Sequence, residues 1–134
     1  MVFMGDEKMN DKDIRAVLVN YLLAQNGDLR IYHEKAIGES ICDIMAVSSC
    51  LTGYEIKSNL DSFTRLERQV NAYNRYFDRC YLVIGESHRK RASDKIPAHW
   101  GLICIQNRRT ASAALSVRFI VVEMALGAYK TQTK

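Results

Sequence analysis

Three short segments that are plausible strands follow one another in the first half of the chain, at residues 29–35, 41–47 and 51–57. The links between them hold only a few residues, with the turn-forming run Ile37-Gly38-Glu39-Ser40 in the first link. Strands joined by such short links pair in antiparallel fashion, because a parallel pair needs a crossover connection of about a dozen residues or more. This stretch therefore predicts a three-stranded antiparallel meander.

An amphipathic helix is expected before this meander and another after it. Apolar residues recur at helical spacing over residues 11–25, after polar capping residues that begin at Asn10. A second apolar stripe steps by three or four positions over residues 60–77, which predicts a helix of about 17 residues. Its other face carries charged side chains, so this helix is expected to lie on the surface of the domain.

Two further strands are expected in the second half of the chain. Residues 80–84 are wholly apolar and stop at Gly85, which is typical of a strand buried on both faces. A polar and basic loop is expected at 87–95, and a last strand at 101–105. The order helix, three strands, helix, strand, strand predicts an α/β fold. The apolar tail segments 111–115 and 117–126 fit either a strand or a helix.

The bulk composition indicates one ordinary globular domain. The 134 residues are 48% hydrophobic and 25% charged, which suits a single domain over 1–134 with its core at about 11–105 and a C-terminal tail at 106–134. No apolar run approaches the roughly 18 residues of a transmembrane helix and no signal region is evident, so a cytoplasmic protein is expected. The net charge of +4 permits an acidic partner such as nucleic acid.

The cysteines and histidines give no sign of a metal centre of their own. The four cysteines form no CxxC pair, so neither a zinc ribbon nor an iron–sulfur cluster is supported. We expect them to be small buried hydrophobic residues. The three histidines are scattered, and no two of them have the spacing of metal ligands.

A carboxylate and an acid–lysine pair occur on two neighbouring predicted strands. Asp43 lies in the second strand, and Glu55 and Lys57 lie on one face of the third, because strand side chains alternate. If these strands pair, two carboxylates and an ammonium group converge. Magnesium prefers such hard oxygen ligands and keeps several waters, so Asp43 and Glu55, with the Ile56 carbonyl, suffice to hold it. Read alone, Glu55 and Lys57 are also compatible with an exposed pair on an edge strand.

These residues resemble the PD-(D/E)XK nuclease superfamily. The resemblance rests on Asp43, on Glu55-Ile56-Lys57, on the order of elements and on Gln69-Val-Asn-Ala-Tyr73, which is similar to the QxxxY motif of the RecB-like and lambda-exonuclease-like branch. The stretch from Gly53 to Gly85 is similar to small uncharacterised bacterial and phage proteins of that superfamily. The resemblance covers about residues 11–105. One departure is Cys42, which stands where the motif's name has proline.

The resemblance implies a restriction-endonuclease-like αβββαβ core, with a central mixed sheet flanked by helices. It further implies a Mg²⁺- or Mn²⁺-dependent DNA nuclease, a hydrolase of DNA repair or recombination. Lys57 would then assist the attacking water, Gln69 would orient a water or the phosphate, and Tyr73 would contact the DNA backbone. Glu34 would be a further acid of the metal site.

Basic side chains on the second helix and in the basic loop are candidate DNA contacts, and each is equally compatible with a solvated surface; they are Arg65, Arg68, Arg89, Lys90 and Arg91. Two other functions remain open. One is a non-catalytic DNA-binding or assembly protein that keeps the nuclease fold. The other is a basic RNA-binding module, although no aromatic-rich recognition strand is evident. The apolar tail could supply the interface of a homo-oligomer.

Overall fold

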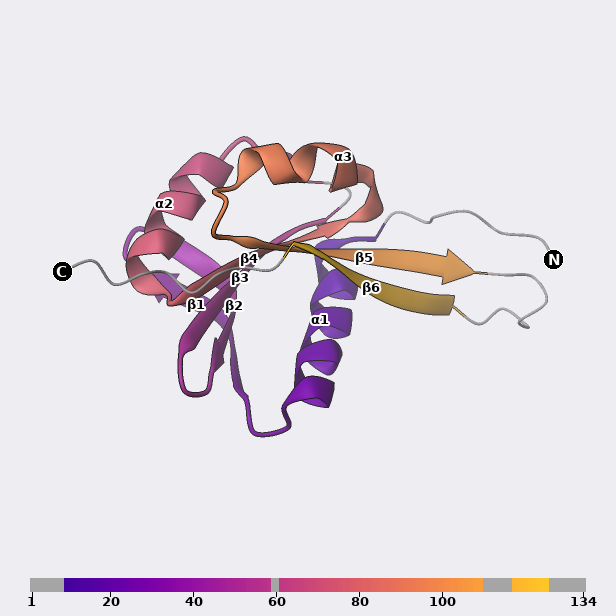
Figure 1. Ribbon diagram of the computed structural model, residues 1–134, viewed down its shortest axis with the longest axis horizontal. Helices are drawn as coiled ribbons and strands as arrows, with labels where there is room; N and C mark the ends of the chain where they lie inside the picture. The colour runs from indigo at the N-terminus through magenta and orange to yellow at the C-terminus, as the bar shows by residue number, and fades with distance from the viewer. Residues whose placement is uncertain (1–8, 59–60, 110–116, 126–134) are drawn as a thin grey trace.

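A six-stranded mixed sheet with helices on both faces forms the body of the protein. We describe it from a computed structural model, over residues 9–58, 61–109 and 117–125 (Figure 1). The strands lie in the order β1-β2-β3-β4-β5-β6. Strands β1 to β3 are antiparallel, β3, β4 and β5 are parallel, and β6 is antiparallel to β5. In chain order the main elements are α1 (Asp11–Gln25), β1 (Arg30–Ile37), β2 (Ser40–Val47), β3 (Leu51–Lys57), α2 (Leu66–Tyr76), β4 (Arg79–Gly85), α3 (Arg89–Ala92), β5 (Gly101–Arg109) and β6 (Val117–Ala125).

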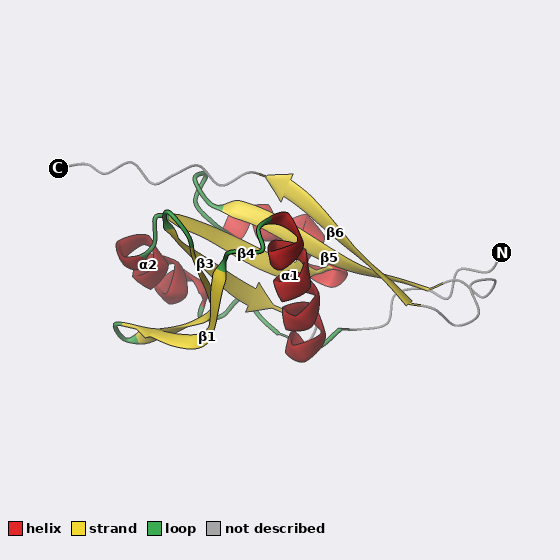
Figure 2. Ribbon diagram, turned by 90° about the horizontal axis from the view of Figure 1, so that it is seen from below, coloured by secondary structure: helices red, strands yellow, loops and turns green. Residues whose placement is uncertain are grey.

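Helix α1 begins and ends where its sequence predicts. The Asn10 side chain accepts a hydrogen bond from the Asp13 backbone N–H at 2.9 Å, and the Asp13 carboxylate accepts one from the Asn10 N–H at 3.2 Å. This reciprocal pair satisfies two N–H groups that the helix itself leaves open. Ile14, Leu18 and Leu22 form the buried face of α1. They pack on one face of the sheet, against a cluster that includes residues from β2 to β5 (Figure 2).

Helices α2 and α3 cover the opposite face of the sheet (Figure 1). Leu66, Val70 and Tyr73 are the buried side of α2. The helix comes so close to β3 that a Cβ on Gly53 would lie 2.5 Å from the Phe77 ring. A glycine is therefore required at that position by the contact with the neighbouring helix.

The second helix is shorter than the periodicity predicts, since it begins at Leu66 and not near residue 60. The Asp61 carboxylate accepts hydrogen bonds from the Ser58 N–H and hydroxyl, at 2.8 and 3.0 Å, and so ties the segment back to the end of β3. The Leu66 N–H then closes a turn on the Phe63 carbonyl. Side-chain bonds of this kind compete with helix formation. Residues 59 and 60 lie outside the described residues.

The predicted meander is confirmed as β1 to β3, and residues 80–84 lie in β4, which is buried over nearly all of its length. The expected loop at 87–95 is instead helical, with α3 between two single 3₁₀ turns at Glu86–His88 and Ser93–Lys95. The second tail segment is a strand, β6, although the first falls outside the described residues. Cys42, Cys80 and Cys104 are buried as expected and form no disulfide among the described residues, whereas Cys50 is only half-buried. No described helix combines the length and apolar character that crossing a membrane would need.

Candidate functional site

The β2 and β3 strands bring the predicted acids together. Asp43 lies one position beyond the last paired residues of the two strands, Ile44 and Tyr54. Its Oδ2 accepts a hydrogen bond of 2.8 Å from the Ile56 backbone N–H, which fixes the carboxylate over β3. Glu55 is buried within hydrogen-bonding reach of it. The Lys57 Nζ lies 3.4 Å from Glu55 Oε2, so the two side chains share a face of β3 as strand alternation predicts.

Tyr73 of α2 lies between the two acids. Its hydroxyl donates to Glu55 Oε1 at 2.6 Å and accepts from the Asp43 N–H at 3.3 Å. The side chain is fully buried, so this phenol is a fixed part of the site. It orients Glu55 and is not exposed to a DNA backbone, which makes the predicted backbone contact of Tyr73 wrong.

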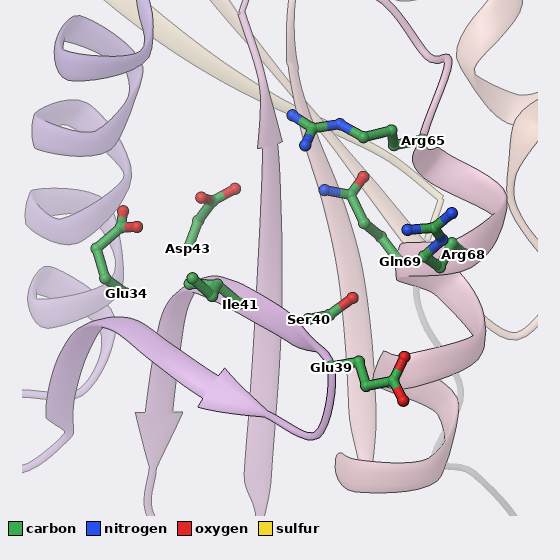
Figure 3. Close-up of a pocket in the computed structure, with 8 residues that line it drawn as sticks. All are labelled: Glu34, Glu39, Ser40, Ile41, Asp43, Arg65, Arg68 and Gln69. Atoms are coloured by element: carbon green, nitrogen blue, oxygen red, sulfur yellow. The ribbon is translucent and has the colours of Figure 1, made fainter.

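A cavity of about 320 Å³ opens beside Asp43, between the β1–β2 hairpin and α2. Figure 3 shows Glu34 and Asp43 on one side of it, with Gln69 of α2 and Arg65, which directly precedes α2, reaching in on the other. The Gln69 Oε1 is buried and has no hydrogen-bond partner among the described residues. The described residues that line it are Glu34, Glu39, Ser40, Ile41, Asp43, Arg65, Arg68 and Gln69. Acidic and basic side chains thus face one another across one cavity.

Arg15 of α1 also belongs to this site, although the sequence does not identify it as a candidate. Its Nη2 lies 2.7 Å from Glu34 Oε2, 3.0 Å from Asp11 Oδ1 and 3.6 Å from Asp43 Oδ1. Its Nη1 donates to the Asp43 backbone carbonyl at 2.9 Å. The one signal in the sequence is the spacing of Asp11 and Arg15, four positions apart on a helix, and that pattern is common on helix surfaces.

Glu34 lies beside the site in an unusual backbone conformation. Its φ of 55° is in the left-handed region, which a non-glycine residue adopts at a cost of about 1–3 kcal/mol. The flanking residues His33 and Lys35 pair with Ile44 and Cys42, so Glu34 faces Asp43 across the hairpin. The ion pair with Arg15 holds its carboxylate toward the site, where the family resemblance implies a further acid.

Burial perturbs the acid–base groups of the site. The pKa of Asp43 is raised from 3.8 to about 7, first by burial and then by the neighbouring Glu55 charge. Burial also raises the pKa of Glu55, against the lowering effect of its bonds to Tyr73 and Lys57. The Tyr73 pKa is raised well above 10.0 by burial and the Glu55 charge. Ionising both carboxylates together is costly, and a bound cation would lower that cost.

The donor set fits a hydrated magnesium ion better than a preformed metal cage. Among the described residues, no three His, Cys, Asp or Glu side chains are arranged to hold a metal. Mg²⁺ needs only one or two carboxylates because it retains water ligands. Asp43, which lines the cavity with Gln69, and the buried Glu55 behind it would supply those hard oxygen atoms.

The basic residues predicted to bind DNA lie in two places. Arg65 and Arg68 line the cavity beside Asp43. Arg89, Lys90 and Arg91 lie on α3 and do not line it. Arg89 is 3.7 Å from Glu86 on a half-exposed surface, so part of its charge is engaged locally. The structure brings the first pair to the acids and leaves the second group apart from them.

Comparisons with known proteins relate this chain to a different family from the one that its motifs resemble. The family described as Bacteriophage P4 protein cII matches residues 4–130. Protein cII of Enterobacteria phage P4 is 22% identical over 121 residues, which cover 87% of this chain and 44% of the relative. The chain therefore spans less than half the length of that curated relative. No solved structure matches.

The family match overturns the resemblance to the PD-(D/E)XK nucleases, and with it the predicted nuclease and hydrolase activity. The error has a physical origin: a paired hairpin followed by a helix brings an acid, an acid–lysine pair and a tyrosine together, and this arrangement by itself does not specify bond cleavage. The match runs through both acids, Lys57 and the α2 residues. The chain belongs to the family of bacteriophage P4 protein cII.

Proposed function

We propose that this chain binds DNA in a non-catalytic binding or assembly role, through the cavity beside Asp43. A Mg²⁺ or Mn²⁺ ion links the carboxylates of this cavity to a DNA phosphate. The observation that carries the proposal is the pairing of acidic and basic side chains across one cavity, with Asp43 opposite Arg65 and Arg68 (Figure 3).

Electrostatics explain why a cation is needed for this cavity to take a phosphate. Arginine guanidinium groups attract phosphate and form paired hydrogen bonds with it. Ionised Asp43 and Glu55 repel the same group at close range. A divalent cation on the acids reverses the sign of that wall, and both walls then attract the phosphate. We therefore expect DNA binding to depend on the cation.

Each predicted site residue has a role in this scheme. Asp43 and Glu55 hold the cation, with the Ile56 carbonyl and Glu34 as further oxygen ligands. Tyr73 keeps Glu55 in place through its 2.6 Å hydrogen bond. Lys57, 3.4 Å from Glu55, contributes positive charge at the buried end of the site. Gln69 offers its amide oxygen, which has no hydrogen-bond partner among the described residues, to a water of the bound ion. The cation supplies charge neutralisation and a bridging ligand position.

The proposal includes a restriction-endonuclease-like core that serves binding. What supports it is the order α1, β1, β2, β3, α2, β4, together with an antiparallel β1–β3 meander whose third strand is parallel to β4. A fold of this kind can hold sites with unrelated functions. The binding site is therefore argued from its residues and not from the fold.

Two further features of the proposal concern partners. The exposed cations Arg89, Lys90 and Arg91 form a second, weaker contact to the DNA backbone. The chain also forms a homo-oligomer, for which the region after residue 105 supplies the interface. Light scattering coupled to size-exclusion chromatography tests the second point, because a molecular mass of 15.3 kDa would identify a monomer.

The central experiment measures the anisotropy of a labelled DNA duplex with the protein in Mg²⁺, Mn²⁺ or EDTA. We expect binding in either metal and at least a tenfold loss in EDTA. Arg65→Gln with Arg68→Gln should weaken binding in Mg²⁺ by about tenfold or more and lower the salt dependence by about two ions. The duplex is recovered after the assay and its length is compared with that of the starting duplex. We expect the length to be unchanged, which would establish that the anisotropy reports binding and not cleavage.

Arg30→Gln provides a matched control, because Arg30 is an exposed cation that does not line the cavity. Its effect should be less than about threefold. Equal affinity in Mg²⁺ and EDTA would contradict the bridging cation. Equal losses for the Arg30 variant and the double variant would contradict the cavity as the binding site. Tighter binding of an RNA duplex or single strand would favour the RNA-binding alternative.

A further inference from the structure

Arg15 contacts more carboxylates than an arginine in an ordinary intrahelical ion pair does. Its guanidinium group lies between carboxylates from three different elements, namely Asp11 of α1, Glu34 of β1 and Asp43 of β2. The side chain is only 18% exposed. A shielded position of this kind strengthens the interaction of a charge with its neighbours, compared with an exposed surface pair.

The charges of the site balance only in part. The connected acids are Asp11, Glu34, Asp43 and Glu55, and the connected bases are Arg15 and Lys57. Among the described residues of this ion-paired group, four negative and two positive groups leave a formal charge of −2 when all are ionised, with Arg65 and Arg68 on the facing wall not counted. Of the two connected bases, Arg15 contacts Glu34 and Asp43, whereas Lys57 contacts Glu55.

We propose that Arg15 is a built-in counter-ion that competes with the divalent cation for Asp43 and Glu34, and so sets the cation affinity of the site. This inference rests on the cation site of the proposed function. The guanidinium group occupies the outer side of Asp43, at Oδ1, while Oδ2 is held by the Ile56 N–H. A cation that approaches Oδ1 therefore meets the positive charge of Arg15.

The contacts favour competition over positioning. The hydrogen bond from the Ile56 N–H to Asp43 is 2.8 Å long, whereas Arg15 lies 3.6 Å from the same carboxylate. The Asp43 carboxylate is thus oriented by the backbone of β3, while the 2.9 Å hydrogen bond of Arg15 goes to the Asp43 backbone carbonyl. The shorter contact of Arg15, 2.7 Å, goes to the more exposed Glu34. Loss of the guanidinium charge should therefore free the acids without misplacing Asp43.

The test compares Mg²⁺ binding to the whole chain by isothermal titration calorimetry, in the absence of DNA. Arg15→Gln removes the charge, and Arg15→Lys keeps it. Lys12→Gln is the matched control, because Lys12 is an exposed cation on the same helix and is not part of the ion-paired group. We expect Arg15→Gln to bind Mg²⁺ about tenfold more tightly than the wild type, and Arg15→Lys and Lys12→Gln to stay within about threefold of it.

A second measurement follows Arg15 in the wild-type chain. Its side-chain Nε–H resonance, assigned from its absence in Arg15→Gln or Arg15→Lys, should shift as Mg²⁺ is added, because the guanidinium group leaves its carboxylates. This readout also serves if Arg15→Gln does not fold. Weaker Mg²⁺ binding by folded Arg15→Gln would overturn the inference in favour of a positioning role. Unchanged binding, or an Nε–H resonance that does not move in a wild type that binds Mg²⁺, would also overturn it. If neither the wild type nor any variant binds Mg²⁺, the cation site of the proposed function fails together with it.

Discussion

Replacing Asp43 with asparagine should stabilise the metal-free protein at neutral and alkaline pH. The side chain keeps its shape and can still accept the Ile56 hydrogen bond, but it no longer carries a charge. The pKa of Asp43 is about 7 in the folded protein, against 3.8 without its surroundings. A raised carboxyl pKa means that the folded state binds the proton more tightly than the unfolded state does. The stability of the wild type therefore falls as the pH rises between these two values.

The size of the effect follows from the shift in pKa. The shift is about 3 units, and each unit corresponds to about 1.4 kcal/mol, so full ionisation costs the folded state about 4 kcal/mol. The advantage of Asp43→Asn over the wild type should grow by about 1.4 kcal/mol per pH unit from about pH 4 to pH 7 and then level off. Any fixed cost of the new amide group shifts the whole curve and leaves its slope unchanged.

Urea denaturation at several pH values between 5 and 8, in EDTA, measures this slope directly. Between pH 5 and pH 8 the difference should increase by about 3 kcal/mol, which corresponds to about 10 °C in Tm for a chain of this size. Glu55 is present in both proteins, but its charge contributes to the raised Asp43 pKa, so the measured slope reports the interacting pair. A difference that does not change with pH would refute the reasoning. Excess Mg²⁺ should narrow the difference at pH 8, because it stabilises only the ionised wild type.

Two substitutions test the contacts between α2 and the sheet. Gly53→Ala places a Cβ 2.5 Å from the Phe77 ring and 2.9 Å from Tyr73. We therefore expect a loss of about 1–3 kcal/mol in the free energy of unfolding. A loss below about 0.5 kcal/mol would show that α2 shifts freely and would contradict the close contact. Tyr73→Phe removes the 2.6 Å hydrogen bond to buried Glu55 and should cost about 1–3 kcal/mol at pH 8 in urea denaturation, and an unchanged stability would mean that Glu55 finds another donor.

The sequence mispredicts the bounds of a helix where a side chain forms hydrogen bonds with the backbone. Helix α1 follows the prediction because its cap and its apolar spacing agree. The start of α2 differs, because Phe63 matches helical spacing while the Asp61 carboxylate is bonded to Ser58. Periodicity records where apolar groups recur and not which backbone groups are already satisfied. The basic segment after β4 was likewise expected as a loop, although it forms short helical turns.

The positions of the site residues are partly predictable for the same kind of reason. Strand alternation places Glu55 and Lys57 on one face, and a short hairpin brings Asp43 beside them, so local rules are enough. Arg15 is not predictable in this way, because its partners Glu34 and Asp43 come from strands that reach α1 only in the complete fold. The activity was predicted wrongly, since the same local rules produce this arrangement whatever the site does.

The energetic cost of the acids is itself an argument that the site binds a ligand. A structural position between β2 and α2 could hold asparagine, which makes the same hydrogen bond to Ile56 without the penalty of about 4 kcal/mol that ionised Asp43 carries. That penalty is a large part of the 5–15 kcal/mol that typically stabilises a domain. Arg15 offsets it only in part, because the Asp43 pKa remains raised to about 7 with Arg15 in place. A divalent cation on the carboxylates would offset the remainder, and it would do so only in the folded state. The same residues that destabilise the metal-free chain would then make its stability and its affinity for phosphate respond together to the cation.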